Sequence, residues 1–308
     1  MARLSWRVRW AILGIMTLAG ITIYFTNALL TERFTASTQQ RAQLRLALYS
    51  GNLISELQRN SIVPRLLASD PELIGALASN DFQQTSQRLL SFVDEIGAAG
   101  IMLLDIDGRV VAATDRLRLG QFHKDAPYFI QALRSNETVF TTTPSLEIGE
   151  LDFAYSRSVV ANQMRLGVVV VEADLRKFET AWRGISDAVI VTDSTGQIIL
   201  TTEQSWLGLN EAEALSRRSA PNAIQRALEA TQGWGNTGAD AYVQGQAVMR
   251  QDLRVPFQGW TMAVFTTYGG VRQRVNAAIA LVVMGFAIFL SLAFYQLSRR
   301  SLTRAVIL

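Results

Sequence analysis

The stretch that decides the fold is "IMLLDIDGRVVAATD", residues 101–115, in which two short apolar runs flank the turn sequence "DIDG". Short runs of apolar and β-branched residues predict strands, and a glycine in the turn between them predicts a β-hairpin. The same pattern returns eighty-eight residues later as "VIVTDSTGQIILTT", residues 189–202. We therefore predict two copies of one antiparallel hairpin. The equivalent residues are Asp105 with Asp193 and Gly108 with Gly196.

The segments around the two hairpins alternate between helical and strand periodicity. The predicted helices cover residues 31–67, a segment from residue 70, a segment after residue 81, and residues 126–133, 175–183 and 221–230. The predicted strands cover residues 101–104, 109–113, 138–143, 151–160, 165–175, 188–192, 197–202, 241–249 and 259–267. Pro64 is expected to bend or end the first helix, and Asp70 is expected to cap the second. The predicted fold class is α/β (α+β), with two tandem modules on a long N-terminal helix.

Two segments, residues 10–30 and 276–297, contain no charged residue and are long enough to cross a membrane as helices. A cleaved signal peptide is the alternative for the first segment, and a buried core helix is the alternative for the second. Arginines lie before the first segment and after the second, and every acidic residue lies between the two. Positively charged flanks stay in the cytoplasm, so we expect both termini inside and residues 31–274 outside.

This topology explains the net charge without a nucleic-acid surface, because the excess of positive charge belongs to the membrane flanks. The expected organisation is a cytoplasmic N-terminus (1–9), a transmembrane helix (10–30), a long periplasmic helix (31–69), a membrane-distal ligand-binding module (70–180), a membrane-proximal module (181–274), a second transmembrane helix (276–297) and a cytoplasmic stub (298–308).

The residue types argue against catalysis by these 308 residues. There is no cysteine and only one histidine, so neither a nucleophile–base set nor a metal site is visible. "DIDG" lacks the other ligands of a calcium loop. We expect no catalytic residue, no metal and no cofactor in this segment.

Several stretches together resemble a known family: "LQRNSIVPRLLASDPEL" (57–73), "DIDGRVVAATD", "APYFIQAL", "GVVVVEADL" and "VTDSTGQIILTT". In this order they resemble the double-Cache, or tandem periplasmic PAS-like, sensor region of bacterial sensor histidine kinases. The resemblance is strongest to the four-carbon dicarboxylate sensor kinases. It implies a bacterial inner-membrane protein that is a homodimer, contacts membrane lipid and binds a small organic ligand. ATP and a response regulator would be used only by a kinase domain that these residues lack.

Three positions depart from the dicarboxylate sensors. Those proteins hold the ligand with an Arg before "PYF", a Tyr three residues earlier and a Lys after "GVVVV". Here the corresponding residues are Ala126, His123 and Glu172. Glu172 would repel a dianion, which predicts a cationic or neutral polar group facing it, as in an amino acid or an amine. A carboxylate ligand remains open if another cation faces the pocket. The candidates for that cation are Lys124, Arg157 and Arg165.

The predicted ligand-binding residues share a place on the expected rim of the distal module. They are His123, Asp125, Tyr128, Phe153, Tyr155 and Glu172. The alternatives are that the aromatic residues fill the core, that Asp125 is a solvated loop charge and that His123 lies at the surface. Glu172 ends an apolar strand and needs a partner if it is buried; Arg157, His123 or a cationic ligand would provide one.

The sequence therefore predicts a membrane-anchored extracytoplasmic sensor of a small organic ligand. We interpret it as the input half of a two-component signal-transduction histidine kinase. The alternative is a complete small-molecule-binding membrane protein that acts through a partner receptor or transporter and has no kinase activity.

Overall fold

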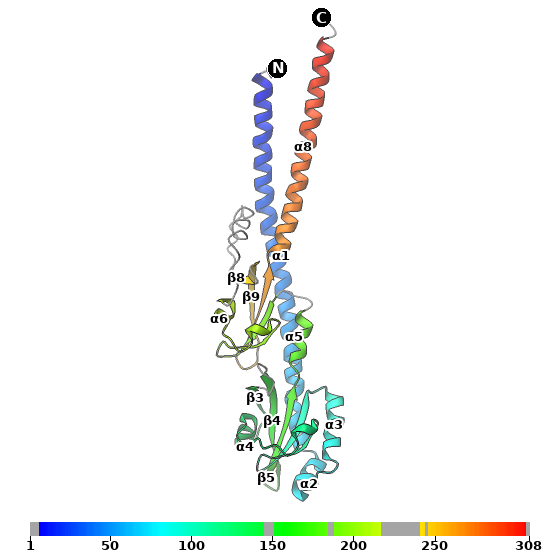
Figure 1. Ribbon diagram of the computed structural model, residues 1–308, viewed down its shortest axis with the longest axis vertical. Coiled ribbons are helices and arrows are strands. Elements are labelled where there is room, and N and C mark those ends of the chain that lie inside the picture. Colours follow the sequence, from blue (N-terminus) through cyan, green and yellow to red (C-terminus); the bar gives the residue numbers. More distant parts are fainter. Residues whose placement is uncertain (1–5, 145–150, 184–187, 217–240, 244–245, 306–308) are drawn as a thin grey trace. The chain divides into compact units, whose positions relative to one another are not determined.

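The computed structural model describes residues 6–144, 151–183, 188–216, 241–243 and 246–305 (Figure 1). The expected helix at 221–230 lies outside these residues. The chain divides into two compact units. One consists of residues 45–216 and 252–264, and the other contains the remaining described residues. Both hairpins belong to the first of these units.

The first helix, α1, is Trp6–Ala68 and contains 63 residues. It joins the first apolar span to the predicted long helix without a break. Pro64 does not end the helix, which continues to Ala68, so that part of the prediction was wrong. Proline removes one backbone donor, but Val63 and Leu67 on either side are 5% and 1% exposed. Their burial in the core stabilises the last helical turn against the intrinsic cost of proline.

The next helix, α2, is Pro71–Ser79, and Asp70 caps it as predicted. The Asp70 Oδ1 atom accepts hydrogen bonds from the backbone N–H groups of Glu72 and Leu73, at 2.8 and 3.2 Å. Proline suits the first helical position because that residue has no hydrogen-bond partner within the helix. Helix α3, Thr85–Ile96, ends at Gly97, whose positive φ of 73° closes the helix.

The first sheet contains five antiparallel strands in the order β2-β1-β5-β4-β3. The strands are β1 (Gly100–Asp105), β2 (Val110–Ala113), β3 (Val139–Pro144), β4 (Leu151–Ala161) and β5 (Met164–Ala173). Helix α4, Pro127–Arg134, lies between β2 and β3 in the chain and begins at the predicted proline. All five strands and this helix were predicted from the sequence.

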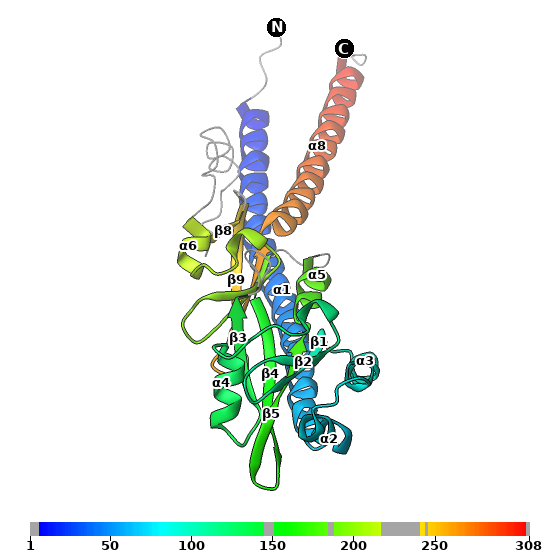
Figure 2. The same cartoon turned by 60° about the horizontal axis from the view of Figure 1, so that its bottom comes forward.

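The two faces of this sheet are covered by different helices (Figure 2). Side chains alternate between faces along a strand. Val169 and Val171 of β5 pack with α2, α3 and the end of α1. Val168 and Val170 pack with α4 on the opposite face. Glu172 continues the second series, so it lies on the α4 face, where β5 ends.

The second sheet repeats the order of the first, as β7-β6-β10-β9-β8. Its strands are β6 (Ala188–Thr192), β7 (Ile198–Thr201), β8 (Ala241–Val243), β9 (Gln246–Arg254) and β10 (Thr261–Thr267). Helix α5, Arg176–Arg183, precedes it, and α6, Glu211–Ser216, follows β7. The predicted fold class, α/β with two antiparallel sheets after a long N-terminal helix, is confirmed.

The predicted equivalence of the two hairpins is also confirmed. In each copy, Oδ1 of the turn aspartate accepts backbone N–H groups two and four residues further on. These distances are 3.0 and 2.9 Å at Asp105, and 2.8 and 3.0 Å at Asp193. Gly108 and Gly196 both have a φ of 83°, which side-chain-bearing residues rarely adopt. The aspartate and the glycine therefore fix the turn in both copies.

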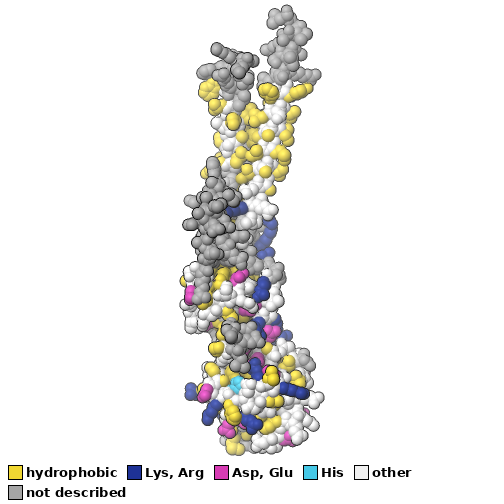
Figure 3. All heavy atoms as spheres, in the orientation of Figure 1, with side chains coloured by type: hydrophobic (Ala, Val, Ile, Leu, Met, Phe, Trp, Pro, Cys, Tyr) yellow, Lys and Arg dark blue, Asp and Glu magenta, His cyan; other side chains and the backbone are white. Residues whose placement is uncertain are grey.

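Two described helices, α1 and α8 (Gly269–Ala305), are long and apolar enough to cross a membrane. The apolar stretches of these two helices have mean hydropathies of 1.6 and 2.6. No residue of either apolar stretch is buried within the protein. Large apolar side chains are exposed on both, including Phe25 at 58% and Phe294 at 71%. Figure 3 shows hydrophobic side chains gathered over these helical segments. Lipid is the solvent that matches such a surface.

Candidate ligand-binding site

The candidate site is a cavity of about 360 Å³ where β5 ends and α5 begins. Its other walls come from the start of β4 and from the turn after β2, which contains the 3₁₀ helix η1, Arg116–Arg118. The charged residues that line it are Asp115, Arg118, Asp152, Glu172, Asp174 and Arg176. Six of the thirteen lining residues are charged, so the cavity suits a small polar organic molecule.

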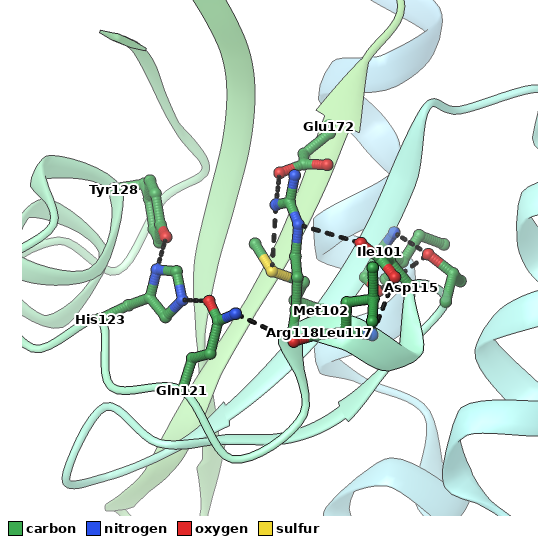
Figure 4. Close-up of polar contacts among 10 residues, drawn as sticks. Ile101, Met102, Asp115, Leu117, Arg118, Gln121, His123, Tyr128 and Glu172 are labelled. Atoms are coloured by element: carbon green, nitrogen blue, oxygen red, sulfur yellow. Dashed lines mark hydrogen bonds and ion pairs between the residues drawn. The ribbon is translucent and has the colours of Figure 1, made fainter. Parts of the chain in front are cut away.

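An ion pair between Arg118 and Glu172 dominates the cavity wall (Figure 4). Arg118 Nη1 donates to Glu172 Oε1, and Arg118 Nε lies 3.8 Å from Asp115 Oδ2. The two paired side chains are 24% and 16% exposed. Asp115 positions the arginine, because its Oδ1 accepts the Leu117 N–H at 2.9 Å and so caps η1. The turn after β2 thereby directs a guanidinium at the end of β5.

The charges of this pair depend on each other. Burial raises the pKa of Glu172, and the positive charge of Arg118 opposes that rise. Burial lowers the pKa of Arg118, but the negative charges of Glu172, Asp152 and Asp115 outweigh this effect and raise it above its ordinary value. A buried carboxylate is costly without such a partner, so Arg118 stabilises the ionised form of Glu172.

A second polar chain links α4 to the same turn. The Tyr128 hydroxyl bonds to His123 Nδ1, His123 Nε2 lies 3.2 Å from Gln121 Oε1, and Gln121 Nε2 donates to the Leu117 carbonyl at 2.9 Å. Because Gln121 Oε1 can only accept, the network assigns the histidine proton to Nε2 and makes Nδ1 an acceptor. Burial and the charge of Arg118 lower the pKa of His123, and burial raises the pKa of Tyr128 to about 12. Both groups are therefore neutral at pH 7.

The structure brings some of the predicted site residues together. Glu172 and Phe153 line the cavity, and His123 and Tyr128 connect to it through the lining residue Gln121. Asp125 is exposed and is not part of the cavity wall.

Tyr155 does not join them. Ala154 is the residue opposite Glu172 in the β4–β5 ladder, so the neighbouring Tyr155 points to the other face of the sheet. There it is 3% exposed and packs against Phe140, with ring centroids 4.8 Å apart.

The partner of Glu172 is Arg118, which was not among the predicted partners. The expected partners lie elsewhere: Arg157 Nη1 is 3.5 Å from Thr138 Oγ1, and His123 bonds to Tyr128. The structure contradicts Arg157 and His123 as this partner, and the third alternative, a cationic ligand, stays a prediction. The repeat carried a signal for Arg118. Trp206 holds the same place in the second hairpin segment, eighty-eight residues later, so a charged residue stands in the first copy where the second has an aromatic one. Among the described residues, no group of three or more His, Cys, Asp or Glu side chains is arranged to hold a metal ion.

No family model matches the chain. It is 25% identical over 314 residues to the C4-dicarboxylate transport sensor protein DctB of Pseudomonas aeruginosa, covering 95% of this chain and 48% of that protein. It is 24% identical over 290 residues to DctB of Rhizobium meliloti, covering 85% of this chain and 45% of that protein. The chain thus spans about half the length of the curated relatives it matches.

Solved structures give the same class. The sensor domain of the V. cholerae histidine kinase DctB has a TM-score of 0.58 at 20% identity, covering 76% of this chain and 98% of that domain. The Pseudomonas fluorescens chemoreceptor CtaA with L-serine has a TM-score of 0.55 at 11% identity, covering 76% and 98%. The Pseudomonas aeruginosa chemoreceptor PctC with GABA has a TM-score of 0.53 at 18% identity, covering 74% and 99%.

The chain therefore has the Cache-like fold of bacterial sensor domains, as its sequence predicted. Within that class it is similar, in sequence and in fold, to the sensor half of the DctB histidine kinases.

Proposed function

We propose that this chain is the membrane-anchored, extracytoplasmic ligand-sensing half of a two-component sensor histidine kinase. The observation that carries the proposal is the cavity beside the Arg118–Glu172 pair, at the junction of β5 and α5. The similarity to DctB over 95% of the chain supports it. In this proposal residues 70–180 bind the ligand and residues 181–274 connect them to the second membrane helix.

The ligand in this proposal is a small polar organic molecule, an amino acid or an amine in preference to a dicarboxylate. Four acidic residues and two arginines line the cavity, so its lining has an excess of negative charge. Relatives with this fold are described with L-serine or GABA bound, whereas DctB is named for C4-dicarboxylates. The charge of this cavity favours ligands that carry an amino group.

Thermal unfolding of the full chain in lipid nanodiscs tests the binding function. We expect one compound from a panel of amino acids, amines and dicarboxylates to raise the unfolding temperature. A ligand at a hundred times its Kd stabilises the folded state by about 2.7 kcal/mol. The shift is expected to disappear in Glu172→Gln and to persist in Glu72→Gln, a matched change at an exposed carboxylate on α2. A panel with no shift in any class would contradict the proposal.

The proposed location is the bacterial inner membrane, with both termini in the cytoplasm and residues 31–274 in the periplasm. The arginines outside the two apolar segments support this orientation. A reporter enzyme fused after Arg274 is expected to be active only if it is one that works in the periplasm. A reporter fused after Leu308 is expected to be active only in the cytoplasm. The reverse pattern would overturn the topology.

The proposed partners extend beyond this segment. A homodimer through α1 is supported by exposed apolar side chains along that helix, with Leu44, Leu48, Ile62 and Leu66 each 57–67% exposed. ATP and a response regulator belong to a kinase domain that these residues do not contain. Autophosphorylation by a protein that carries this chain and the reading frame after Leu308 tests that part. A stop codon directly after Leu308 would contradict it.

A further inference from the structure

The residue that ends the 3₁₀ helix differs between the two copies of the hairpin segment. Arg118 ends η1, and Trp206 ends the equivalent 3₁₀ helix η2, Gln204–Trp206. Equivalent backbone bonds follow both turns: Gly120 N–H donates to the Val110 carbonyl at 2.8 Å, and Gly208 N–H donates to the Ile198 carbonyl at 2.9 Å. The second copy thus forms the same turn with a neutral side chain that is 7% exposed.

In the first copy the Arg118 guanidinium pairs with the Glu172 carboxylate, the group with which an amino group of a ligand would pair. Glu172 Oε1 accepts the bond from Arg118 Nη1, and Glu172 is 16% exposed. The negative charges of Asp152 and Asp115 also act on this guanidinium, and both residues line the same cavity. The Arg118 guanidinium is therefore paired with Glu172 in the way that the amino group of a bound ligand would be.

We propose that Arg118 is an internal cation that a cationic ligand displaces from Glu172, which makes Arg118 the residue that determines specificity. This inference rests on the proposed function of the cavity. Displacement leaves neither charge unpaired: the ligand cation pairs with Glu172, and Arg118 Nε already lies 3.8 Å from Asp115 Oδ2. A dicarboxylate cannot make this exchange, because it carries no cation for Glu172 and would enter a lining of four acidic residues and two arginines.

A carboxylate on the ligand gains little here, since Arg118 Nε already lies 3.8 Å from Asp115 Oδ2 and the lining also includes Asp152 and Asp174. Apolar walls provide the remaining contacts. Leu117, Leu151 and Leu175 line the cavity, and Leu117 is 85% exposed, so a ligand would remove it from water. The ligand class is therefore an amine with a small apolar body and no carboxylate.

Three probes of nearly equal size test this by calorimetry on the full chain in nanodiscs: n-butylamine, GABA and butyrate. We expect n-butylamine to bind more tightly than GABA, and butyrate not to bind. In Arg118→Ala the affinity for n-butylamine is expected to rise by about tenfold or more, because the competing conformation is removed. Arg116→Ala, an exposed arginine on the same turn, is the matched control and is expected to change nothing. If Arg118→Ala weakens amine binding, or GABA binds most tightly, the proposal is wrong.

Guanidinium ion provides a measurement that needs no natural ligand. Low-millimolar guanidinium chloride, compared with sodium chloride at equal ionic strength, is expected to raise the unfolding temperature of Arg118→Ala by refilling the vacated place. It is expected to have no such effect on the wild type or on Arg118→Ala/Glu172→Gln. No stabilisation of Arg118→Ala would overturn the inference even if the ligand panel succeeds. A panel without any hit, together with guanidinium stabilisation, would contradict the proposed function alone.

Discussion

The two hairpin segments, residues 101–122 and 189–210, have the same backbone and different side-chain chemistry. Both contain an aspartate-capped turn, a glycine at a φ of 83° and a 3₁₀ helix at the same offset. The first copy ends that 3₁₀ helix with an arginine that enters a cavity, and the second ends it with a buried tryptophan. One shared framework thus forms a charged site in one module and a packed core in the other.

The helices that support these hairpins differ in the same way. In the first module Ser86 Oγ of α3 accepts the Ala113 N–H at 3.2 Å. In the second, Glu179 Oε1 of α5 accepts the equivalent Thr201 N–H at 3.0 Å. The structural role is equal, but the second copy places an ionisable group at 8% exposure. The comparison separates what the backbone needs from what each side chain adds.

The largest expected effect tests the difference between the two copies at the last residue of the 3₁₀ helix. Trp206→Ala is expected to lower the free energy of unfolding by about 3–5 kcal/mol, because it empties a buried site. Arg118→Ala is expected to cost less, under about 2 kcal/mol, because its side chain is 24% exposed and Glu172 has a raised pKa and can take a proton. Urea titrations of both variants provide the measurement. Equal losses would mean that the arginine is needed for packing.

The turn glycines provide the next test. Gly108→Ala and Gly196→Ala both place a side chain at a positive φ, at a cost of roughly 1–2 kcal/mol. Only at Gly108 would the new Cβ also meet backbone, with Lys124 Cα at 2.8 Å and Lys124 N at 2.9 Å. This overlap is expected to add about 1–3 kcal/mol. Urea titration of the matched pair checks the difference, and a larger loss at Gly196 would contradict it.

Much of this fold was predictable because its signals are local. The hairpins followed from apolar runs around an Asp-x-x-Gly turn, and α2 followed from Asp70 and Pro71. Helix α1 continues through Pro64 because burial of the neighbouring side chains outweighs the tendency of proline to end a helix.

The site was less predictable, because it depends on strand register. Arg118 and Glu172 are 54 residues apart in sequence, and only the pairing of β1 with β5 brings the turn after β2 to the end of β5. Tyr155 lies outside the cavity lining for the same reason. A shift of one residue in the β4–β5 register changes the face of every side chain, and a single sequence does not specify that register.

A smaller effect is expected at Glu179 of α5, which accepts in the second module the bond that Ser86 of α3 accepts in the first. Burial raises the pKa of Glu179 above its ordinary value of 4.5. The folded state therefore holds this proton more tightly than the unfolded chain does, and its contribution to stability is present below the unfolded pKa and is lost as the pH rises through the folded pKa. Glu179→Gln keeps the acceptor for Thr201, so it is expected to be more stable than the wild type near neutral pH and to lose that advantage in acid.

Thermal unfolding at several pH values checks this prediction. Ser86→Ala is the control from the first module. It is expected to cost about 0.5–1.5 kcal/mol, the value of one hydrogen bond, at every pH. A pH-independent difference between Glu179→Gln and the wild type would show that the carboxyl group does not titrate differently on unfolding.

The smallest expected effect concerns His123, whose equivalent in the second copy is Glu211 at the start of α6. Burial, followed by the positive charge of Arg118, lowers the pKa of His123 below its ordinary value of 6.5. The folded state therefore binds this proton less tightly than the unfolded chain, so the contribution to stability is present above the unfolded pKa and is lost as the pH falls through the folded pKa. Protonation would also replace the acceptor at Nδ1, which the Tyr128 hydroxyl uses, with a donor.

His123 is the only histidine in the chain, so one imidazole resonance reports it directly by NMR. We expect its pKa to lie below 6.5 in the wild type and to move toward that value in Arg118→Ala, which removes the second cause. An unchanged pKa in that variant would mean that the guanidinium does not act on the histidine, and that the two polar chains of the site are independent.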